Sequence, residues 1–307
     1  MTTLFWLRFS NFEFRVPPLN IRTKAEFSLA LITAIWGFTF VIVKGALADA
    51  SPLPFLAVRF MLAGLLLLVI LGRGRVGRGT ILPGSILGLF LFGGYLFQTW
   101  GLVYTTPSKS AFLTGFSVIL VPIIMMLLGH KLGPATLLGA VLGLAGIYLL
   151  VAPSGMSGVN LGDLLTLAGA TSFAVHIVLV GRYTKRFSFL HLVPVQILAV
   201  GLLASVAMVV FPAQKWHFSA HLAVAILVTA VLATGVAFSV QNWAQQYTPP
   251  AHTALLFALE PVFAAISSWL VVGEHFRGRT LAGAGLILAG MVVSEIWGAR
   301  VASPVEG

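Results

Sequence analysis

The chain has 307 residues, of which 59% are hydrophobic and only 8% charged, and its mean hydropathy is +1.02. A soluble domain averages about 25% charged residues, so this composition excludes a water-facing surface over most of the chain and requires lipid as its solvent. The formal net charge of +10 would point to nucleic acid in a soluble protein, but membrane proteins carry Lys and Arg in their loops for topological reasons, so we expect no nucleic-acid partner.

Residues 1–25 precede the first long apolar stretch and lack the uninterrupted apolar core of a signal peptide. We expect them to form a cytoplasmic N-terminal segment. Ten stretches follow that can each cross about 30 Å of hydrocarbon as a helix of about 20 residues. Their ranges are 26–48, 54–72, 81–103, 108–128, 134–152, 161–181, 189–211, 221–243, 250–272 and 279–299. The sequence therefore predicts an all-α membrane protein with ten transmembrane helices and a cytoplasmic tail at 300–307.

Loop charges predict the orientation, because cytoplasmic loops are enriched in Lys and Arg. With the N-terminus inside, the cytoplasmic segments hold Arg8, Arg15, Arg22, Lys24, Arg73, Arg75, Arg78, Lys131, Arg182, Lys185, Arg186 and Arg300, and the outer loops hold Lys109, Lys215, Arg277 and Arg279. Twelve basic residues against four favour a multi-pass protein of the inner membrane of the cell, with both termini in the cytoplasm. The pair Arg277 and Arg279 runs against this orientation.

One stretch of the sequence is written twice, at Gln98–Ala111 and again 143 residues later at Gln241–Ala254. Chance would give roughly one identity in a window of this length, but six residues are identical: Gln98, Trp100, Tyr104, Thr105, Pro107 and Ala111 match Gln241, Trp243, Tyr247, Thr248, Pro250 and Ala254. At an offset of 144, Gly129, Thr136, Gly139, Ala145 and Gly146 recur as Gly273, Thr280, Gly283, Ala289 and Gly290. The chain therefore contains two copies of one unit, at 26–152 and 161–299.

Each copy has five predicted spans, an odd number, so the second copy starts on the opposite side of the membrane from the first. Inverted repeats of this kind are typical of secondary transporters, whose substrate lies near the membrane midplane between the two halves. Glycines at helix-packing spacing, Gly139, Gly143 and Gly146 with Gly283 and Gly290, have two interpretations. They pack helices tightly within one bundle, or they form the seam of a homodimer.

Several short motifs in this arrangement carry a family resemblance. Trp36-Gly37 is followed by Lys44, Pro54 and Arg59-Phe60 in the first copy, and Glu260-Pro261 is followed by Gly273-Glu274 in the second. In this order, over residues 26–299, the sequence resembles the EamA family of the drug/metabolite transporter superfamily. The resemblance implies a ten-span exporter of amino acids, other metabolites or drugs, with a central cavity that opens alternately to either side.

Glu260 is the candidate site residue with the clearest physical argument. It lies about ten residues into the ninth span, near mid-depth, where a carboxylate costs at least about 2.5 kcal/mol. One interpretation is that it faces the cavity and couples transport to protons, or meets a substrate amine. The other is that it is neutral and hydrogen-bonds a neighbouring helix. Pro261 removes a helical hydrogen bond and predicts a local kink.

Other candidates lie on the first, second, third, sixth and eighth spans. We expect substrate-binding residues among Trp36, Phe40, Gln98, Trp100, His176, Gln241, Trp243 and Glu260, and coupling or gating residues among Glu260, Lys44 and Arg59. Trp100 and Trp243 lie near the interfaces, where tryptophan usually anchors a span, so an anchoring role is the alternative for both. Lys44 and Arg59 lie within about two turns of the outer boundary, so their side chains can instead reach the interface. His176 has a further interpretation as a hydrogen-bonded packing residue.

These observations predict a secondary transporter that exports small organic metabolites, such as amino acids or similar amphipathic compounds, by alternating access and with possible proton coupling. An intramembrane enzyme acting on a lipid-like substrate is one alternative, although the spans contain no HExxH or GxSxG motif. A membrane scaffold or sensor is the other. The chain has no cysteine, which excludes disulfides and thiolate metal sites, and we expect no cofactor and no metal ion.

Overall fold

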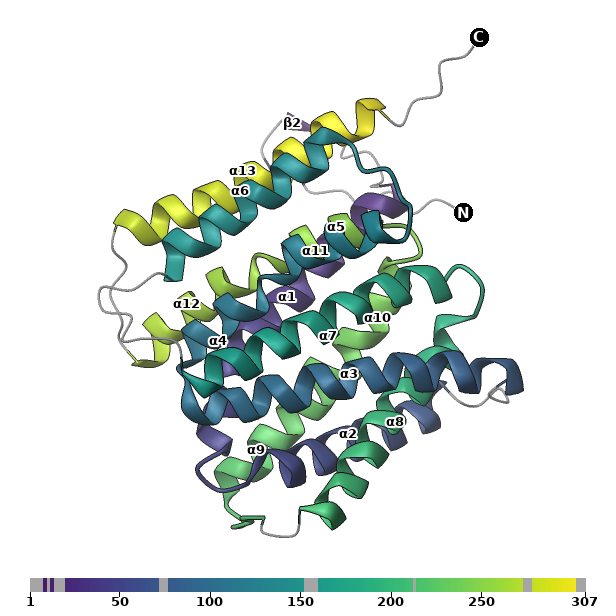
Figure 1. Cartoon of the computed structure of the whole chain (residues 1–307), viewed down its shortest axis with the longest axis vertical. Helices are drawn as coiled ribbons and strands as arrows, with labels where there is room; N and C mark the ends of the chain where they lie inside the picture. Colours follow the sequence, from purple (N-terminus) through teal and green to yellow (C-terminus); the bar gives the residue numbers. More distant parts are fainter. Residues whose placement is uncertain are drawn as a thin grey trace.

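A bundle of helices makes up nearly all of the protein (Figure 1). The computed structural model describes residues 8–9, 12–13, 20–71, 77–151, 160–211, 214–272 and 278–301. Two short strands, β1 (Arg8–Phe9) and β2 (Phe12–Glu13), pair antiparallel ahead of the bundle. The helices of the first copy are α1 (Ile21–Ala46), α2 (Pro52–Leu71), α3 (Arg78–Tyr104), α4 (Pro107–Thr114), α5 (Ser117–Leu127) and α6 (Pro134–Val151). Those of the second are α7 (Leu161–Tyr183), α8 (Phe189–Val210), α9 (Ala220–Val228), the π-helix η1 (Thr229–Val236), α10 (Ala237–Ala244), α11 (Pro250–Phe257), α12 (Glu260–Val272) and α13 (Gly278–Val301).

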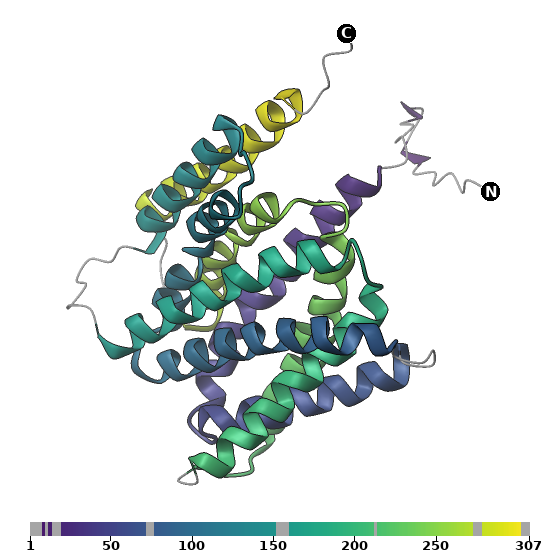
Figure 2. The same cartoon turned by 45° about the vertical axis from the view of Figure 1, so that its right-hand side comes forward.

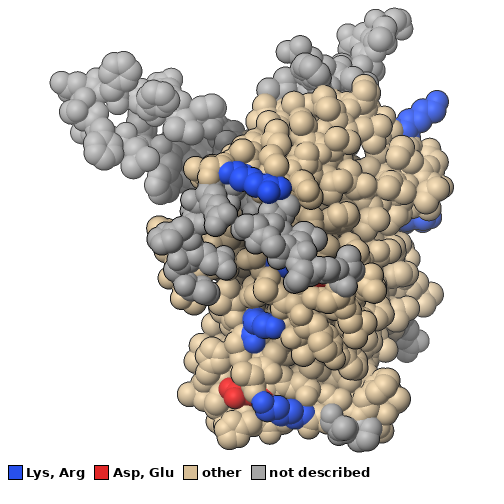
Figure 3. Space-filling view, turned by 60° about the vertical axis from the view of Figure 1, so that its left-hand side comes forward, with Lys and Arg blue, Asp and Glu red and all other residues tan. Residues whose placement is uncertain are grey.

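Apart from β1 and β2, the described elements are helices, so the predicted helical bundle is confirmed for the described residues. Each predicted span corresponds to one helix or to a run of consecutive helices, and eight of these are long and apolar enough to cross a membrane. The other two, α6 and α13, contain shorter apolar stretches, Pro134–Leu149 and Leu281–Ser294. Few charged side chains of the described residues lie on the face in Figure 3, as expected for a surface that contacts lipid.

The first helix starts earlier than the sequence predicted. We expected it to begin near residue 26, but α1 begins at Ile21, because the side chain of Asn20 accepts a hydrogen bond of 2.8 Å from the backbone N–H of Thr23. This cap satisfies one of the free N–H groups of the first turn. Most of the remaining N-terminal segment, the tail after Val301, Arg277 and the Gly273-Glu274 motif lie outside the described residues.

Two spans break at equivalent positions near their centres. The fourth is interrupted at Gly115 and Phe116, between α4 and α5, and the ninth at Ala258 and Leu259, between α11 and α12. The predicted kink at Pro261 is confirmed, since proline has no N–H to donate to the carbonyl four residues earlier. Both breaks occur in the same register, because 258 − 115 = 143 is the offset of the sequence repeat.

Equivalent helices of the two copies pack against each other in antiparallel pairs, as Figures 1 and 2 show for α6 with α13. A Cβ atom added to Gly139 would lie 2.7 Å from the carbonyl oxygen of Gly290, and one added to Gly146 would lie 2.5 Å from that of Gly283. The order of the contacts is reversed along the two helices, so α6 and α13 run antiparallel. These glycines are buried between two helices of one chain, so they pack the bundle and are not an exposed homodimer seam.

The pair α2 and α8 packs in the same way at the opposite side of the bundle (Figure 1). Gly64 lies against Leu198, and Gly201 lies against Met61, with added Cβ atoms 2.6 Å and 2.8 Å from the nearest side-chain atoms. Between these two pairs lie α1, α3, α7, η1, α10, α11 and α12, which enclose the interior of the bundle.

Candidate functional site

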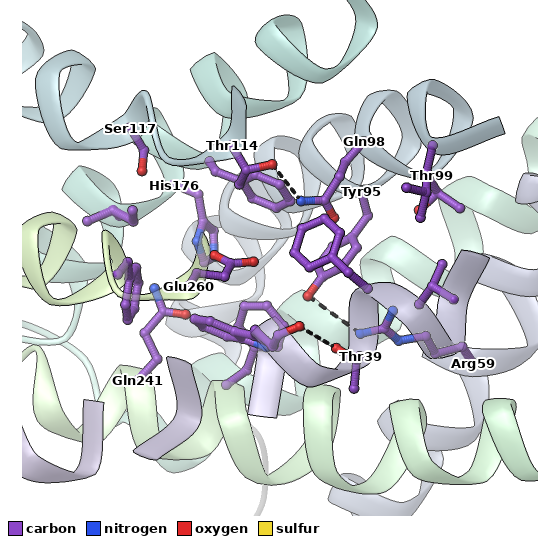
Figure 4. A pocket seen from close by; sticks show the side chains of 18 residues that line it. Thr39, Arg59, Tyr95, Gln98, Thr99, Thr114, Ser117, His176, Gln241 and Glu260 are labelled. Atoms are coloured by element: carbon purple, nitrogen blue, oxygen red, sulfur yellow. Dashed lines mark hydrogen bonds between the residues drawn. The ribbon is translucent and has the colours of Figure 1, made fainter. Parts of the chain in front are cut away.

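A cavity lies inside the bundle, beside the breaks in the fourth and ninth spans (Figure 4). Its volume is about 70 Å³, and since one water needs about 10–15 Å³ on this measure, it holds about five to seven waters or a small organic molecule. The lining residues come from both copies: Trp36, Thr39, Phe40, Val43, Arg59, Tyr95, Gln98, Thr99, Leu102, Thr114, Ser117, Phe173, His176, Ile177, Phe238, Gln241, Phe257 and Glu260. Aromatic and polar side chains therefore share the cavity wall.

The cavity is displaced toward one end of the bundle. Along α1, the lining residues run from Trp36 to Val43, near the helix end at Ala46. The earlier part of α1, from Ala25 to Ile32, packs in a separate apolar cluster with residues of α5, α7, α10 and α11. This cluster, here called the α1-start core, separates the cavity from the end of the bundle where α1 begins.

Equivalent residues of the two copies line the cavity in pairs. At the repeat offset of 143, the lining contains Tyr95 with Phe238, Gln98 with Gln241, Thr114 with Phe257, and Ser117 with Glu260. Trp36 and His176 form a further pair, because their separation of 140 equals that of the helix-capping residues Asn20 and Asn160. At these five pairs of positions, both copies therefore contribute equivalent residues to the cavity wall.

Trp36 is held by the π-helix of the eighth span. Its indole Nε1 donates a hydrogen bond of 2.9 Å to the carbonyl oxygen of Ala233 in η1. The wider turn of a π-helix frees carbonyl groups from the regular ladder, and such segments often occur at functional sites. The ring also packs against Phe238 and Phe257, with centroids 5.4 Å and 5.0 Å away. Trp36 is therefore fixed at the cavity wall, where the sequence predicted it.

Arg59 points into the cavity and not to the membrane surface. Its residue surface is 2% exposed, and its Nε donates a hydrogen bond of 2.9 Å to Thr234 Oγ1 in η1. Its Nη2 lies 3.5 Å from the hydroxyl oxygen of Tyr95. The guanidinium also stacks on the rings of Tyr95 and Phe60, at 4.8 Å and 5.1 Å from their centroids. These contacts exclude the interpretation that Arg59 extends to the interface.

Glu260 lies at the break between α11 and α12 and is 8% exposed. In Figure 4 its carboxyl group points into the cavity, apart from Arg59. Among the described residues, none forms a hydrogen bond or an ion pair with this carboxyl group. The backbone of Glu260 is fixed by α1, because a Cβ added to Gly37 would lie 2.8 Å from its carbonyl oxygen. The neighbours Trp36 and Gly37 thus place the ring and the acid in one cavity.

His176 and the two glutamines form polar contacts at the cavity wall. His176 Nε2 lies 2.8 Å from Gln196 Oε1 of α8, so this histidine both lines the cavity and joins two helices. Gln98 Nε2 donates a hydrogen bond of 2.9 Å to Thr114 Oγ1, and Gln241 Nε2 donates one of 3.0 Å to Gln245 Oε1. The Oε1 atom of Gln241 is buried and has no hydrogen-bond partner among the described residues. It is an acceptor available at the wall.

Three candidates from the sequence do not line this cavity. Lys44 Nζ donates hydrogen bonds of 2.6, 3.2 and 3.1 Å to the carbonyl oxygens of Leu102, Val103 and Thr105. It therefore caps the C-terminal end of α3, where a cation is favourable. Trp100 packs edge-on to Phe211 and Trp243 to Tyr247 at the ends of their spans.

The basic residues of the predicted outer loops have local partners where the structure describes them. Lys109 Nζ forms an ion pair of 2.6 Å with Asp163, which also accepts hydrogen bonds from Thr105 Oγ1 and the backbone N–H of Asn160. Lys215 Nζ donates to the carbonyl oxygen of Ala48. The guanidinium of Arg279 lies 5.7 Å from the ring centroid of Tyr148. These contacts give each cation a structural role, which a count of Lys and Arg residues in the loops does not take into account.

Comparison with known proteins places the chain among transporters. The model of the EamA-like transporter family matches residues 23–152 and again 160–295. An uncharacterized transporter of Archaeoglobus fulgidus is 36% identical over 276 residues, which cover 90% of this chain and 87% of the relative. The uncharacterized transporter YoaV of Bacillus subtilis is 23% identical, over 88% and 96% of the two chains.

More distant similarities extend this result. A chloroplastic WAT1-related protein of Arabidopsis thaliana is 27% identical over 82% of this chain and 65% of its own length. A protein of known crystal structure superposes with a TM-score of 0.75 over 92% of this chain and 100% of its own, at 21% identity. At that identity the likeness concerns the fold alone.

Proposed function

Because the chain belongs to the EamA-like transporter family, we propose that it exports small organic metabolites, such as amino acids or similar amphipathic compounds, by alternating access. The observation that carries this proposal is the cavity, which four pairs of equivalent residues line at a sequence offset of 143 and a fifth pair lines at an offset of 140. An aromatic and polar lining of this kind suits an amphipathic cargo, since rings take the apolar part and polar groups fix its orientation.

Alternating access requires two halves that are related by inversion, and the helix contacts support this arrangement. Gly139 is equivalent to Gly283, and Gly146 to Gly290, at the offset of 144. Gly139 contacts Gly290, and Gly146 contacts Gly283. Contacts exchanged between equivalent positions are the signature of a two-fold axis. Because α6 and α13 are antiparallel, this axis is perpendicular to the helices and thus lies in the membrane plane, as in other transporters with inverted repeats.

The pair α2 and α8 provides independent support. Met61 and Leu198 are 137 residues apart, as are Gly64 and Gly201, and the contacts again cross from one position to the equivalent of the other. Two helix pairs on opposite sides of the bundle therefore favour the same axis.

The two ends of the cavity differ in how they are closed. The apolar α1-start core fills one end, and the contacts of Lys44, Lys109 and Asp163 lie at the other, where α1 and α3 end. With both termini in the cytoplasm of an inner-membrane protein, the cavity is displaced toward the outer side. Loading from the cytoplasm then requires the α1-start core to part while the opposite end closes.

Glu260 is the residue that we propose couples cargo movement to protons. Its buried carboxyl group lines the cavity and has no hydrogen-bond partner among the described residues. A buried acid at mid-depth is expensive unless it exchanges a proton or meets a cation. It therefore binds a proton in one step of the cycle and a cargo amine in another.

Transport by purified protein in proteoliposomes tests this function. We expect flux of small amphipathic compounds that a proton gradient accelerates, and we expect the Glu260→Gln variant to lose the acceleration. Full proton-dependent flux by this variant would contradict the coupling. Cargo binding without any flux would favour a scaffold or sensor, and chemical turnover without flux would favour an enzyme.

A further inference from the structure

Arg59 is a buried cation for which the described part of the chain supplies no anionic partner. Its hydrogen bonds use Nε and Nη2, toward the hydroxyl groups of Thr234 and Tyr95, and none uses Nη1. Hydroxyl groups and ring faces solvate a guanidinium but do not neutralise it. A charge at this depth in a membrane is costly and usually belongs to a substrate or ion pathway. Because Arg59 also lines the cavity, its missing counter-charge can come from the cargo.

The internal repeat shows that this cation is particular to one half. Arg59 and Gln196 are 137 residues apart, the offset that relates α2 to α8. Gln196 is neutral and hydrogen-bonds His176. At the other charged position, Glu260 is equivalent to Ser117, since 260 − 117 = 143. Each of the two charged residues of the cavity, Arg59 and Glu260, therefore corresponds to a neutral residue in the other copy. A charge that served only helix packing would not need to differ between equivalent positions.

The geometry of the guanidinium favours a carboxylate. Tyr95 and Phe60 pack against Arg59, and an anion can approach along the edge of the guanidinium. The fork of N–H groups on a guanidinium matches the two oxygens of a carboxylate. A phosphate monoester would bring about −1.5 to −2 charges at neutral pH, more than a single cation neutralises in a cavity that also contains Glu260.

On the basis of the transport function proposed above, we propose that Arg59 and Tyr95 form a carboxylate-binding subsite, so the cargo is a small monocarboxylate. The cargo carboxylate pairs with Arg59 at one side of the cavity. Its apolar part lies against the rings of Trp36, Phe173 and Phe238. A cargo amine, where present, faces Glu260 on the other side (Figure 4).

Two probes of one carbon skeleton test the subsite in purified wild-type protein: isovalerate and isovaleramide. Binding is measured as the rise of the melting temperature with probe concentration. We expect isovalerate to bind at least tenfold more tightly than isovaleramide, because a charge-assisted pair is worth about tenfold or more in affinity. Equal binding of the two probes to the wild-type protein would overturn the proposal, without reference to any variant.

The chain itself offers matched variants. Arg59→Gln installs the residue that the second copy has at this position, and Lys44→Met removes a cation that does not line the cavity. We expect Arg59→Gln to lose the tenfold preference for isovalerate and Lys44→Met to keep it. Arg59→Lys keeps the charge but not the fork of N–H groups, so it should keep part of the preference. A preference that survives in Arg59→Gln, or disappears in Lys44→Met, would contradict the assignment.

Flux of leucine and leucinamide in proteoliposomes separates this proposal from the function on which it rests. Comparable flux of both compounds would support the transport function and contradict the carboxylate subsite. A preference for isovalerate that depends on Arg59, without flux of leucine or leucinamide, would support the subsite and contradict the transport of these compounds. Flux of leucine at least tenfold above that of leucinamide supports both.

Discussion

Replacing Gly37 with Ala tests the close approach of α1 to the break in the ninth span. A Cβ at this position would lie 2.5 Å from Phe263 Cβ, 2.8 Å from the carbonyl oxygen of Glu260 and 2.9 Å from the backbone nitrogen of Ala264. None of these atoms can move by a side-chain rotation alone, so α1 and α12 must separate. Overpacking of this kind costs about 1–3 kcal/mol, and because two of the three atoms are backbone, we expect about 2–3 kcal/mol.

The assay is the melting temperature of the purified protein, with flux in proteoliposomes as the second readout. A loss of about 2–3 kcal/mol lowers the midpoint by on the order of 5–10 °C in a protein of this size. Flux should also fall, since Trp36 and Glu260 flank the contact. The control is Gly285→Ala in α13, where an added Cβ meets nothing within 4 Å. A Gly37→Ala protein as stable as this control would refute the reasoning.

Three further substitutions test the polar contacts around the cavity. Asp163→Asn should lower stability by about 1.5–3 kcal/mol, because it removes a charge-assisted contact with Lys109. In a double-mutant cycle with Lys109→Met, the fall in melting temperature of the double variant should be smaller than the sum of the two single falls. Lys44→Met should cost about 0.5–2 kcal/mol in the same assay, because the end of α3 loses its cationic cap; an unchanged midpoint would contradict this. Trp36→Phe should cost about 1–3 kcal/mol by leaving the carbonyl of Ala233 without its donor, and a flux and midpoint equal to wild type would exclude a positioning role.

Hydropathy and the internal repeat were sufficient to predict the helices and much of the cavity. Each predicted span corresponds to helical structure, and Trp36, Phe40, Gln98, His176, Gln241 and Glu260 all line the cavity. Pro261 signalled one break, but the matching break at Gly115 has no proline at the corresponding place. The offset of 143 relates Glu260 to Ser117 and Tyr95 to Phe238, and it therefore identifies lining residues that were not predicted. It also relates Gln241 to Gln98, which supports the prediction that both line the cavity.

The orientation of Arg59 and Lys44 could not be predicted from the sequence. In a soluble helix, polarity distinguishes the exposed face from the buried one, but lipid and protein interior are both apolar, so α2 gives no such signal. Arg59 turns inward because Thr234 and Tyr95 are there to receive it. Lys44 turns toward the end of α3 for a similar reason. Both partners lie far away in the sequence, and only the folded bundle brings them together.

Labelling of single cysteines tests the inverted arrangement most directly, and the native chain has no cysteine to interfere. Ala48 and Lys185 are both exposed and lie 137 residues apart, in equivalent loops of the two copies. In vesicles of known orientation, a membrane-impermeant maleimide should label Ala48→Cys only from the outer side and Lys185→Cys only from the cytoplasmic side. Labelling of both from the same side would contradict two inverted halves and the alternating access built on them.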